Sequence, residues 1–254
     1  MDFDTVFLQR RSIRAFEDAP VPSETKALIL QAMLRAPTAG ALMLYSVIEI
    51  EDPALKSRLA ETCDHQGFIA KAPWVLVFLA DYARLYGYFE REGVGELCER
   101  SGRPLLAPRE ADLLLACCDA LAAAQTLVCA AEALGLGSCY IGDIMENWET
   151  HRELLDLPRY TFPVTMLVLG RPTEQQRKRP QVPRLGAGLV VHTDRYRPAS
   201  PADYGLMYQR EGYGASVPGG EARTRGQELY LRKFAAPYSE EMRRSVASML
   251  EDWR

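Results

Sequence analysis

The sequence predicts an α+β fold, in which helices surround a central mixed β-sheet of about five strands. Residues 74–80 are seven consecutive apolar residues, the pattern of a strand that is buried on both faces. Residues 111–136 form a long helix that is apolar around most of its circumference. The predicted strands and helices do not alternate as βαβ units do, and this favours α+β over a parallel α/β fold.

Two helices are expected before the first strand. Residues 2–10 form a short helix. Ser23 caps a second helix, which ends at Ala36 because the residue before a proline avoids the helical region. The buried side of this second helix is expected to consist of Leu28, Ile29, Ala32 and Met33.

Three segments flank the central apolar strand. Residues 44–50 alternate well enough for a strand, and residues 53–63 form a helix. Residues 82–108 are of mixed character and contain several glycines and prolines. We therefore expect a loop or lid with some helix there.

The long apolar helix has one narrow polar stripe. A helix that is apolar on its other sides must be covered on most of them, so it lies in the middle of a core or of a subunit interface. Gly135 and Gly137 end it. The polar stripe consists of Asp119, Gln125, Thr126 and Glu132.

The composition changes near residue 198. Before it, strands are expected at residues 138–142, 164–170 and 189–192, with a helix at 149–155. Residues 198–236 hold six glycines, and a final helix capped by Ser239 follows. We expect one domain over residues 1–197 and a C-terminal extension over 198–254, whose helix packs on a partner or over the site. Its apolar face consists of Met242, Val246, Met249, Leu250 and Trp253.

Charge and apolar patterning exclude several classes of protein. The net charge is −4, whereas a chain that binds nucleic acid through its overall field is usually basic. The N-terminus has no long apolar run, and the longest apolar stretch carries Asp119 and Glu132. We expect a soluble, cytoplasmic protein with no nucleic-acid or membrane partner.

The cysteines and histidines carry no recognisable site. The six cysteines form no C-x-x-C motif, and we expect reduced, structural thiols. The three histidines are far apart and show no metal-binding spacing, so no metal is predicted. No local pattern supports a Cys–His hydrolase.

Two segments of the N-terminal region suit a phosphorylated, planar ligand. Arg10, Arg11, Ser12 and Arg14 lie within five residues, and guanidinium groups bind phosphate oxygens in pairs. The alternative is a solvated surface cluster. The small residues 37–40 let a ring approach the backbone, although an ordinary helix-to-strand turn has the same composition.

Two later segments have compositions that are found in nucleotide-binding sites. Residues 135–142 are rich in glycine, but they close a helix and precede a strand, the reverse of a dinucleotide-binding loop. NAD binding by that route is not expected, and there is no Walker loop. The basic residues 178–184 supply a second phosphate contact or form a solvated loop.

These motifs together resemble the FMN-dependent nitroreductase family. Residues 10–16 (RRSIRAF) look like its (H/R)-R-S-x-R-x-F opening, and residues 35–40 (RAPTAG) are similar to its small-residue loop. Gln66 occupies the position of a glutamine in the flavin reductase and NADPH-nitroreductase branch, and residues 135–142 resemble that branch's G-L-G-x-x-Y-I-G-G. Residues 157–158, 169–172 and 183–185 follow in the family order, so that the resemblance covers roughly residues 3–197.

The resemblance implies an intertwined homodimer with two FMN sites at the subunit interface. Arginines and Ser12 would hold the phosphate, the small-residue loop and Gln66 would line the isoalloxazine, and the amides of Gly142 and Asp143 would face flavin N5. The implied cofactor-binding residues are Arg10, Arg11, Ser12, Arg14, Pro37, Thr38, Ala39, Gly40, Gln66, Phe68, Tyr140, Ile141, Gly142, Asp143 and Arg184.

The activity that the resemblance implies is a ping-pong oxidoreductase reaction. NAD(P)H, the co-substrate, delivers hydride to flavin N5 and leaves, and a nitroaromatic, quinone or flavin acceptor replaces it. The chemistry is the cofactor's, so no catalytic side chain is named. The alternatives are an FMN-binding protein with little turnover, and a member with distinct chemistry such as reductive dehalogenation or flavin fragmentation.

The chain departs from the family pattern at three positions. Ala41 replaces a frequent polar residue, and Val182 replaces the lysine of the K-P-R phosphate clamp. Asp143 stands where the family has a second glycine. Its carboxylate either lies near the reactive edge of the flavin or turns away to cap the next segment.

Overall fold

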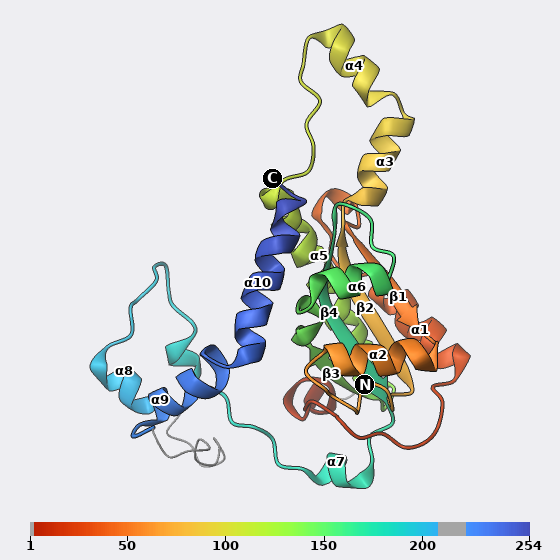
Figure 1. The fold of residues 1–254 in the computed structure, drawn as a ribbon. Coiled ribbons are helices and arrows are strands. Elements are labelled where there is room, and N and C mark those ends of the chain that lie inside the picture. The colour runs from red at the N-terminus through yellow and green to blue at the C-terminus, as the bar shows by residue number, and fades with distance from the viewer. Residues whose placement is uncertain (1–2, 208–221) are drawn as a thin grey trace. The chain divides into compact units, whose positions relative to one another are not determined.

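The computed structural model, which describes residues 3–207 and 222–254, has the predicted α+β architecture (Figure 1). Its described strands form one sheet in the order β1-β2-β4-β3, and every neighbouring pair is antiparallel. A parallel pairing occurs at an isolated bridge between Ser12 and Ser138. The strands are β1 (Tyr45–Ile50), β2 (Trp74–Asp81), β3 (Gly137–Ile141) and β4 (Thr161–Gly170).

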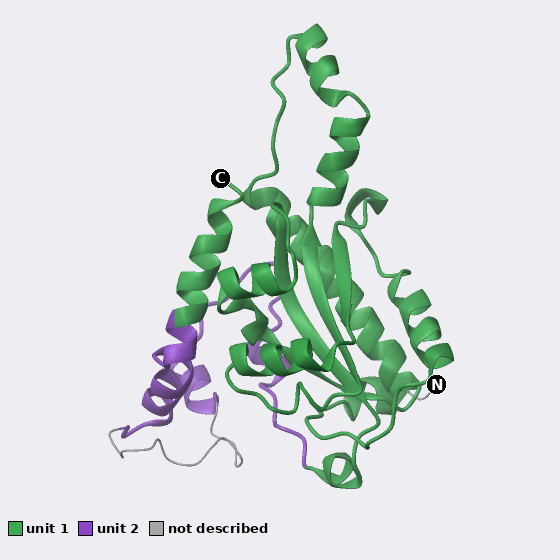
Figure 2. Cartoon of the chain, turned by 45° about the vertical axis from the view of Figure 1, so that its right-hand side comes forward, with its two compact units in different colours: residues 1–179, 241–254 green, residues 180–240 purple. Residues whose placement is uncertain are grey.

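By its contacts the chain divides into two compact units, coloured separately in Figure 2. Residues 1–179 and 241–254 form the first, and residues 180–240 form the second. Helices in the first unit are α1 (Ser23–Met33), α2 (Pro53–Thr62), α3 (Ala83–Arg91), α4 (Val94–Ser101), α5 (Glu110–Ala133), α6 (Trp148–Leu154) and α7 (Glu174–Lys178). The second unit contains α8 (Pro201–Leu206) and α9 (Arg225–Leu229), and α10 (Pro237–Glu251) begins there and continues into the first unit.

Shorter helical turns complete the chain. Two are π-helical, Asp4–Leu8 and Tyr230–Phe234. The 3-10 turns are Ala39–Ala41, Gly142–Met145 and Ala187–Leu189. Asp4–Leu8 takes the place of the short helix predicted over residues 2–10.

The predicted core elements are confirmed. All eight residues of β2 are buried, as expected for a strand covered on both faces. Helix α5 packs against all four strands, and in Figure 1 it lies behind the sheet while α2 and α6 lie in front. By length and composition alone α5 could cross a bilayer, but its packing against the sheet accounts for the apolar residues on its buried side. Gly135, at a φ of 77°, follows the end of the helix, whereas Gly137 already belongs to β3.

The strand predicted over residues 189–192 is wrong. Ala187–Leu189 form a 3-10 turn, and Val190 and Val191 are 61% and 70% exposed. A short apolar run becomes a strand only where a neighbouring strand supplies hydrogen bonds. The described sheet therefore has four strands rather than about five, and its strand pairs are all antiparallel rather than mixed.

The polar stripe predicted on α5 is wrong at Asp119, whereas Gln125 is exposed as expected. Asp119 is only 4% exposed, because its carboxylate accepts hydrogen bonds from a neighbouring loop. The exposed side of α5 is instead largely apolar. It includes Leu114, Leu115, Cys118 and Leu121.

Two details of the N-terminal helices differ from expectation. Ser23 is the first residue of α1 and makes no capping hydrogen bond, and Leu28 is exposed while Ile29 and Met33 enter the core. In contrast, the Asp52 side chain caps α2 by accepting from the Ala54 amide at 2.9 Å. Within residues 82–108, the expected helical content takes the form of α3 and α4.

The C-terminal part of α10 packs on the first unit. Met249 and Trp253 are buried there, and Val246 and Leu250 pack against the same core, as the predicted apolar face requires. Ser239 lies inside the helix rather than capping it. The two units divide at residues 179/180 and 240/241, and Met249 and Trp253 after the second division contribute to the main core. The domain boundary expected at 197/198 stays a prediction.

Two glycines seat the arginine-rich N-terminal segment against the sheet. A Cβ on Gly137 would collide with Ile13 and come within 2.8 Å of Pro172. A Cβ on Gly170 would come within 2.9 Å of Phe16. The missing side chains leave notches that hold Ile13 and Phe16, so the segment between them lies beside β3.

Replacing Gly137 with alanine should lower the free energy of unfolding by about 1–3 kcal/mol, because the added methyl overpacks the notch. Chemical denaturation measures the change. Gly87→Ala in α3 is the control, since an added Cβ there meets nothing within 4 Å and a helical Gly→Ala change stabilises by up to about 1 kcal/mol. A Gly137→Ala protein as stable as the wild type would contradict this seating of Ile13.

Candidate functional site

The arginine-rich segment runs along the edge of β3. The Ile13 amide donates to the carbonyl of Ser138 at 2.8 Å. Arg10, Arg14 and Arg179 all act on the thiol of Cys139: burial raises its pKa, and the three guanidinium groups oppose that rise. Positive charge from distant parts of the sequence is thus concentrated at the start of this strand.

Arg11 has a structural role in this cluster. Its Nη1 donates to the carbonyls of Arg177 and Arg179, at 2.7 and 2.5 Å. Arg179 in turn donates from Nη2 to the carbonyl of Ser12 at 2.6 Å. These hydrogen bonds connect residues 11–12 to residues 177–179, so the Arg11 guanidinium is engaged within the protein.

Arg14 is exposed and lies beside an aromatic ring. Its guanidinium carbon is 5.9 Å from the centre of the Phe68 ring, within the range of a cation–π contact. Its backbone amide donates to Gln176 Oε1 at 3.2 Å. The side chain is available for a further anionic partner, consistent with the role that the sequence predicts for it.

The small-residue loop after α1 is tied to α5 by Asp119. This carboxylate accepts from the Thr38 hydroxyl, from the Ala39 amide at 2.9 Å and from the Leu44 amide at 3.1 Å. The Thr38 hydroxyl oxygen also accepts from the Met43 amide at 2.8 Å. Both ends of the loop are therefore fixed to a single buried side chain.

The loop holds an unusual backbone conformation. Gly40, Ala41 and Met43 have φ values of 55°, 58° and 52°. Residues other than glycine rarely adopt positive φ, and such strain persists only where the surroundings impose it. The bonds to Asp119 supply that constraint, and they leave Pro37 and Gly40 on the exposed side of the loop.

Gln66 and Asp143, predicted separately, are joined directly. Gln66 Nε2 donates to Asp143 Oδ2 at 2.8 Å and to the Cys63 carbonyl at 3.1 Å. These bonds use the donor end of the amide and fix its orientation. The Gln66 carbonyl oxygen is the end that remains to accept a hydrogen bond from a ligand.

The residues at the end of β3 have different surroundings. Tyr140 donates its hydroxyl to Gln125 Oε1 at 3.1 Å, and burial raises its pKa to about 12. Ile141 is in the core. A Cβ on Gly142 would meet nothing within 4 Å, so open space faces its backbone.

Arg184 lies in the second unit, where its Nη1 donates to the carbonyl of Val182 at 2.8 Å. Its predicted contact with a phosphate stays a prediction. The segment 178–184 spans the division between the units, and Arg179 on the first-unit side already joins the arginine cluster.

The residues of the first unit fit FMN by their chemistry. A cluster of guanidinium groups suits a phosphate dianion. An exposed glycine on a rigid loop and the open space at Gly142 allow a flat ring to approach the backbone. The acceptor oxygen of Gln66 complements the N3–H of an isoalloxazine ring.

Several residues that support the candidate site are not evident from the sequence pattern. Asp119 was assigned to a solvated stripe, although a lone acid among apolar helical residues already signals a buried partner. Arg179 was considered only as part of a basic loop. Glu146, which is buried beside Asp143, gave no sequence signal because its neighbours come from distant parts of the chain.

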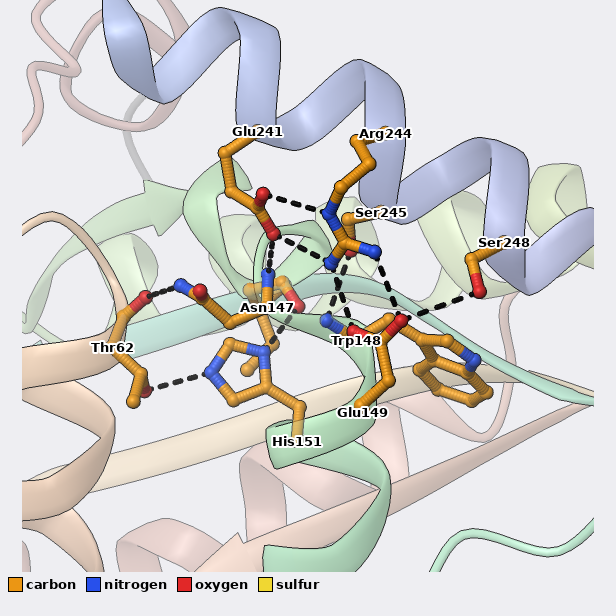
Figure 3. A network of polar contacts seen from close by, with 10 residues as sticks. Thr62, Asn147, Trp148, Glu149, His151, Glu241, Arg244, Ser245 and Ser248 are labelled. Carbon is orange, nitrogen blue, oxygen red and sulfur yellow. Dashed lines mark hydrogen bonds and ion pairs between the residues drawn. The ribbon is translucent and has the colours of Figure 1, made fainter.

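The turn that carries Gly142 and Asp143 is fixed by a polar network, drawn in Figure 3. Buried His151 lies 2.9 Å from the Ile144 carbonyl through Nδ1 and 2.7 Å from the Thr62 hydroxyl through Nε2, and burial lowers its pKa. The Asn147 amide donates to Glu241 at 3.1 Å, and the Trp148 amide to Ser245 at 2.9 Å. Helices α2 and α10 therefore hold the turn from two sides.

Comparisons with known proteins show which sequences and structures this chain resembles. The sequence model of the Nitroreductase family matches residues 7–171. An oxygen-insensitive NADPH nitroreductase of Salmonella typhimurium is 35% identical over 188 residues, which are 74% of this chain and 72% of the relative. An FMN reductase [NAD(P)H] of Bacillus subtilis is 33% identical over 186 residues, 73% and 71% of the two chains. The structure of an NADPH:FMN oxidoreductase of Vibrio harveyi complexed with NAD+ covers 96% of each chain, with 27% identity and a TM-score of 0.77.

Asp119→Asn should destabilise the protein by about 1–3 kcal/mol, because an amide cannot accept from all of the donors that the carboxylate serves. Denaturant unfolding measures this loss. Glu110→Gln, on the exposed first turn of the same helix, is the control and should change stability by a few tenths of a kcal/mol. Equal stability of the Asp119→Asn and wild-type proteins would contradict the role assigned to this carboxylate.

Proposed function

The chain belongs to the nitroreductase family, and we propose that it is an FMN-dependent oxidoreductase that uses NAD(P)H to reduce nitroaromatic, quinone or flavin acceptors. The names of its relatives support both the cofactor and the co-substrate. The proposal is supported by three separate features of the first unit: the arginine cluster at Cys139, the small-residue loop fixed by Asp119, and Gln66 oriented by Asp143.

In the proposed site each group of residues has a separate task. Arg10 and Arg14, supported by Arg179, hold the phosphate of FMN, and Arg11 keeps their backbone in place. The loop of Thr38, Ala39 and Gly40 supports the ring, with Pro37 at its start, and Phe68 packs beside Arg14. Further contacts are assigned to Ser12, Gln66, Tyr140, Ile141, Gly142, Asp143 and Arg184.

When bound, FMN supplies the transfer of a hydride equivalent from NAD(P)H to the acceptor. The protein's residues bind and orient it. Gln66 accepts from the ring, while its amide group stays locked between Cys63 and Asp143. The open backbone at Gly142 lets the ring lie close to the end of β3.

We propose that the working form is a homodimer, as the sequence predicts. The supporting observation is the apolar outer side of α5, where Leu114 is 68% and Leu121 46% exposed. A contiguous row of exposed leucines on a soluble protein is typical of an interaction surface. We also retain the proposals that the C-terminal extension contacts the partner and that the protein is cytoplasmic, where its six free cysteines stay reduced.

Arg14→Ala should weaken FMN binding tenfold or more, because a charge-assisted contact to phosphate contributes about 1.5–3 kcal/mol. Titration of the apoprotein with FMN, followed by flavin fluorescence, measures the affinity. Arg58→Ala is the control, since Arg58 pairs with Glu61 on the surface of α2. A wild-type protein that is colourless and takes up no FMN would overturn the proposed function.

Leu121→Asp should convert the dimer into a monomer, because it places a charge in a desolvated apolar interface. Sedimentation velocity at micromolar concentration measures the state of assembly. Leu121→Met preserves size and apolarity and should remain dimeric. A folded wild-type protein that sediments as a monomer would show that this side of α5 has another role.

A further inference from the structure

Asp143 and Glu146 form a pair of acids at the end of β3. The two carboxyl groups are within hydrogen-bond reach of each other, and the Glu146 amide donates to the Asp143 carbonyl at 3.0 Å. Gln66 Nε2 donates to the other side of the Asp143 carboxylate. The pair thus touches a residue that the proposed function places against the flavin ring.

Glu146 is buried without a full set of partners. It is 3% exposed, and its Oε1 has no hydrogen-bond partner in the part of the chain that the structure describes. Two carboxyl groups can hydrogen-bond to each other only if one of them carries a proton. Burial, Asp143 and more distant acids raise the pKa of Glu146 to about 8, so the protonated form predominates at neutral pH.

Within the described residues, the charged groups that act on Glu146 are all acids. Asp64 follows α2, and Glu241 comes from α10; both raise the pKa of Glu146 further. Glu241 is itself paired with Arg244 at 2.8 Å. Cys63 shares the site as a neutral thiol, because burial and the two acids raise its pKa. His151, on α6, is also buried and neutral, since its pKa is lowered.

A metal site is not the explanation. Among the residues that the structure describes, no group of three or more His, Cys, Asp or Glu side chains could hold a metal ion. The pair instead has the composition of a carboxylic acid hydrogen-bonded to a carboxylate. Such a pair holds one proton that either member can carry.

We propose that Asp143 and Glu146 share one proton and that this proton is delivered to the electron acceptor during its reduction. The inference rests on the proposed function, because that function places Gln66 and Asp143 beside the flavin. Asp143 is the more exposed of the two, so it is the member assigned to the side of the acceptor. Glu146 is a positioning residue that stores the proton and returns it to Asp143.

The stoichiometry requires one such proton per hydride. A quinone becomes a hydroquinone by taking a hydride from the reduced cofactor on one oxygen and a proton on the other. A nitro group gives a nitroso group and water from the same pair, hydride plus proton. NAD(P)H provides the electrons, the acid pair provides the proton, and solvent water restores it after product leaves.

The shared proton is tested first without the cofactor. Infrared spectra of the apoprotein at pH 7 should contain the carbonyl stretches of protonated carboxylic acids, and Glu146→Gln should remove one component of this band. Burial raises the pKa of Glu132 to about 7 as well, so the component from that residue should remain. Because the folded state retains this proton while the unfolded state loses it above its ordinary pKa, the wild type should lose stability relative to Glu146→Gln as the pH rises from about 5 to about 8. Absence of both signals would overturn the shared proton.

Delivery is tested by reoxidation of the NADPH-reduced, FMN-loaded enzyme in stopped flow. Asp143→Asn and Glu146→Gln should slow reduction of 1,4-benzoquinone by about 10²-fold, the low end of general acid catalysis. Glu146→Gln, at a residue outside the proposed cofactor contacts, should leave reduction of ferricyanide unchanged, because that ion takes single electrons and no proton. In the wild type, the quinone rate alone should fall above about pH 8.

Asp64→Asn is the matched control, since it removes a neighbouring negative charge but neither member of the pair. It should keep the quinone rate at pH 7. Equal slowing of quinone and ferricyanide, or no slowing of either, would overturn proton delivery while FMN binding and bleaching by NADPH left the proposed function intact. Loss of FMN binding in the wild type would instead refute the proposed function, and the infrared test would still decide whether the proton is shared.

Discussion

The candidate site depends on the bonds between Asp119 and the loop after α1. One carboxylate from the central helix accepts from Thr38, Ala39 and Leu44, and so fixes a loop whose backbone is strained at Ala41 and Met43. Without it, the buried amides would lack acceptors and the loop would relax to ordinary φ values. The same helix packs against every strand of the sheet. The position of a flavin-supporting loop is therefore set by the core rather than by the loop's own sequence.

The arginine-rich segment of the candidate site is fixed by packing. Gly137 and Gly170 leave notches for Ile13 and Phe16, which place the intervening Arg14 along β3. Arg11 then anchors this segment to the backbone near Arg179. Guanidinium groups repel one another, so holding several of them together before an anion binds needs such a rigid seat. Contacts within the protein therefore position the arginines before a phosphate binds.

The sequence predicted what depends on local pattern and missed what depends on distant partners. Seven apolar residues sufficed for β2, and the arginine motif sufficed for the phosphate-binding hypothesis. Asp119 was misplaced because helical periodicity cannot reveal that a loop 75–81 residues away donates to it. The strand over residues 189–192 failed for the converse reason, since no described strand pairs with it. Of the site residues, the link between Gln66 and Asp143 required the fold.

Asp119 and Glu146 show how one fold uses two buried acids differently. Asp119 is surrounded by two backbone amides and a hydroxyl, and these donors replace the water lost on burial. Glu146 faces other acids and a neutral thiol, so its burial is compatible only with a bound proton. The first arrangement gives rigidity, and the second gives a group that can exchange a proton near neutral pH. The departure from glycine to aspartate at position 143 matters for this reason: it gives the Glu146 proton a partner at the end of β3, where the proposed flavin chemistry consumes one.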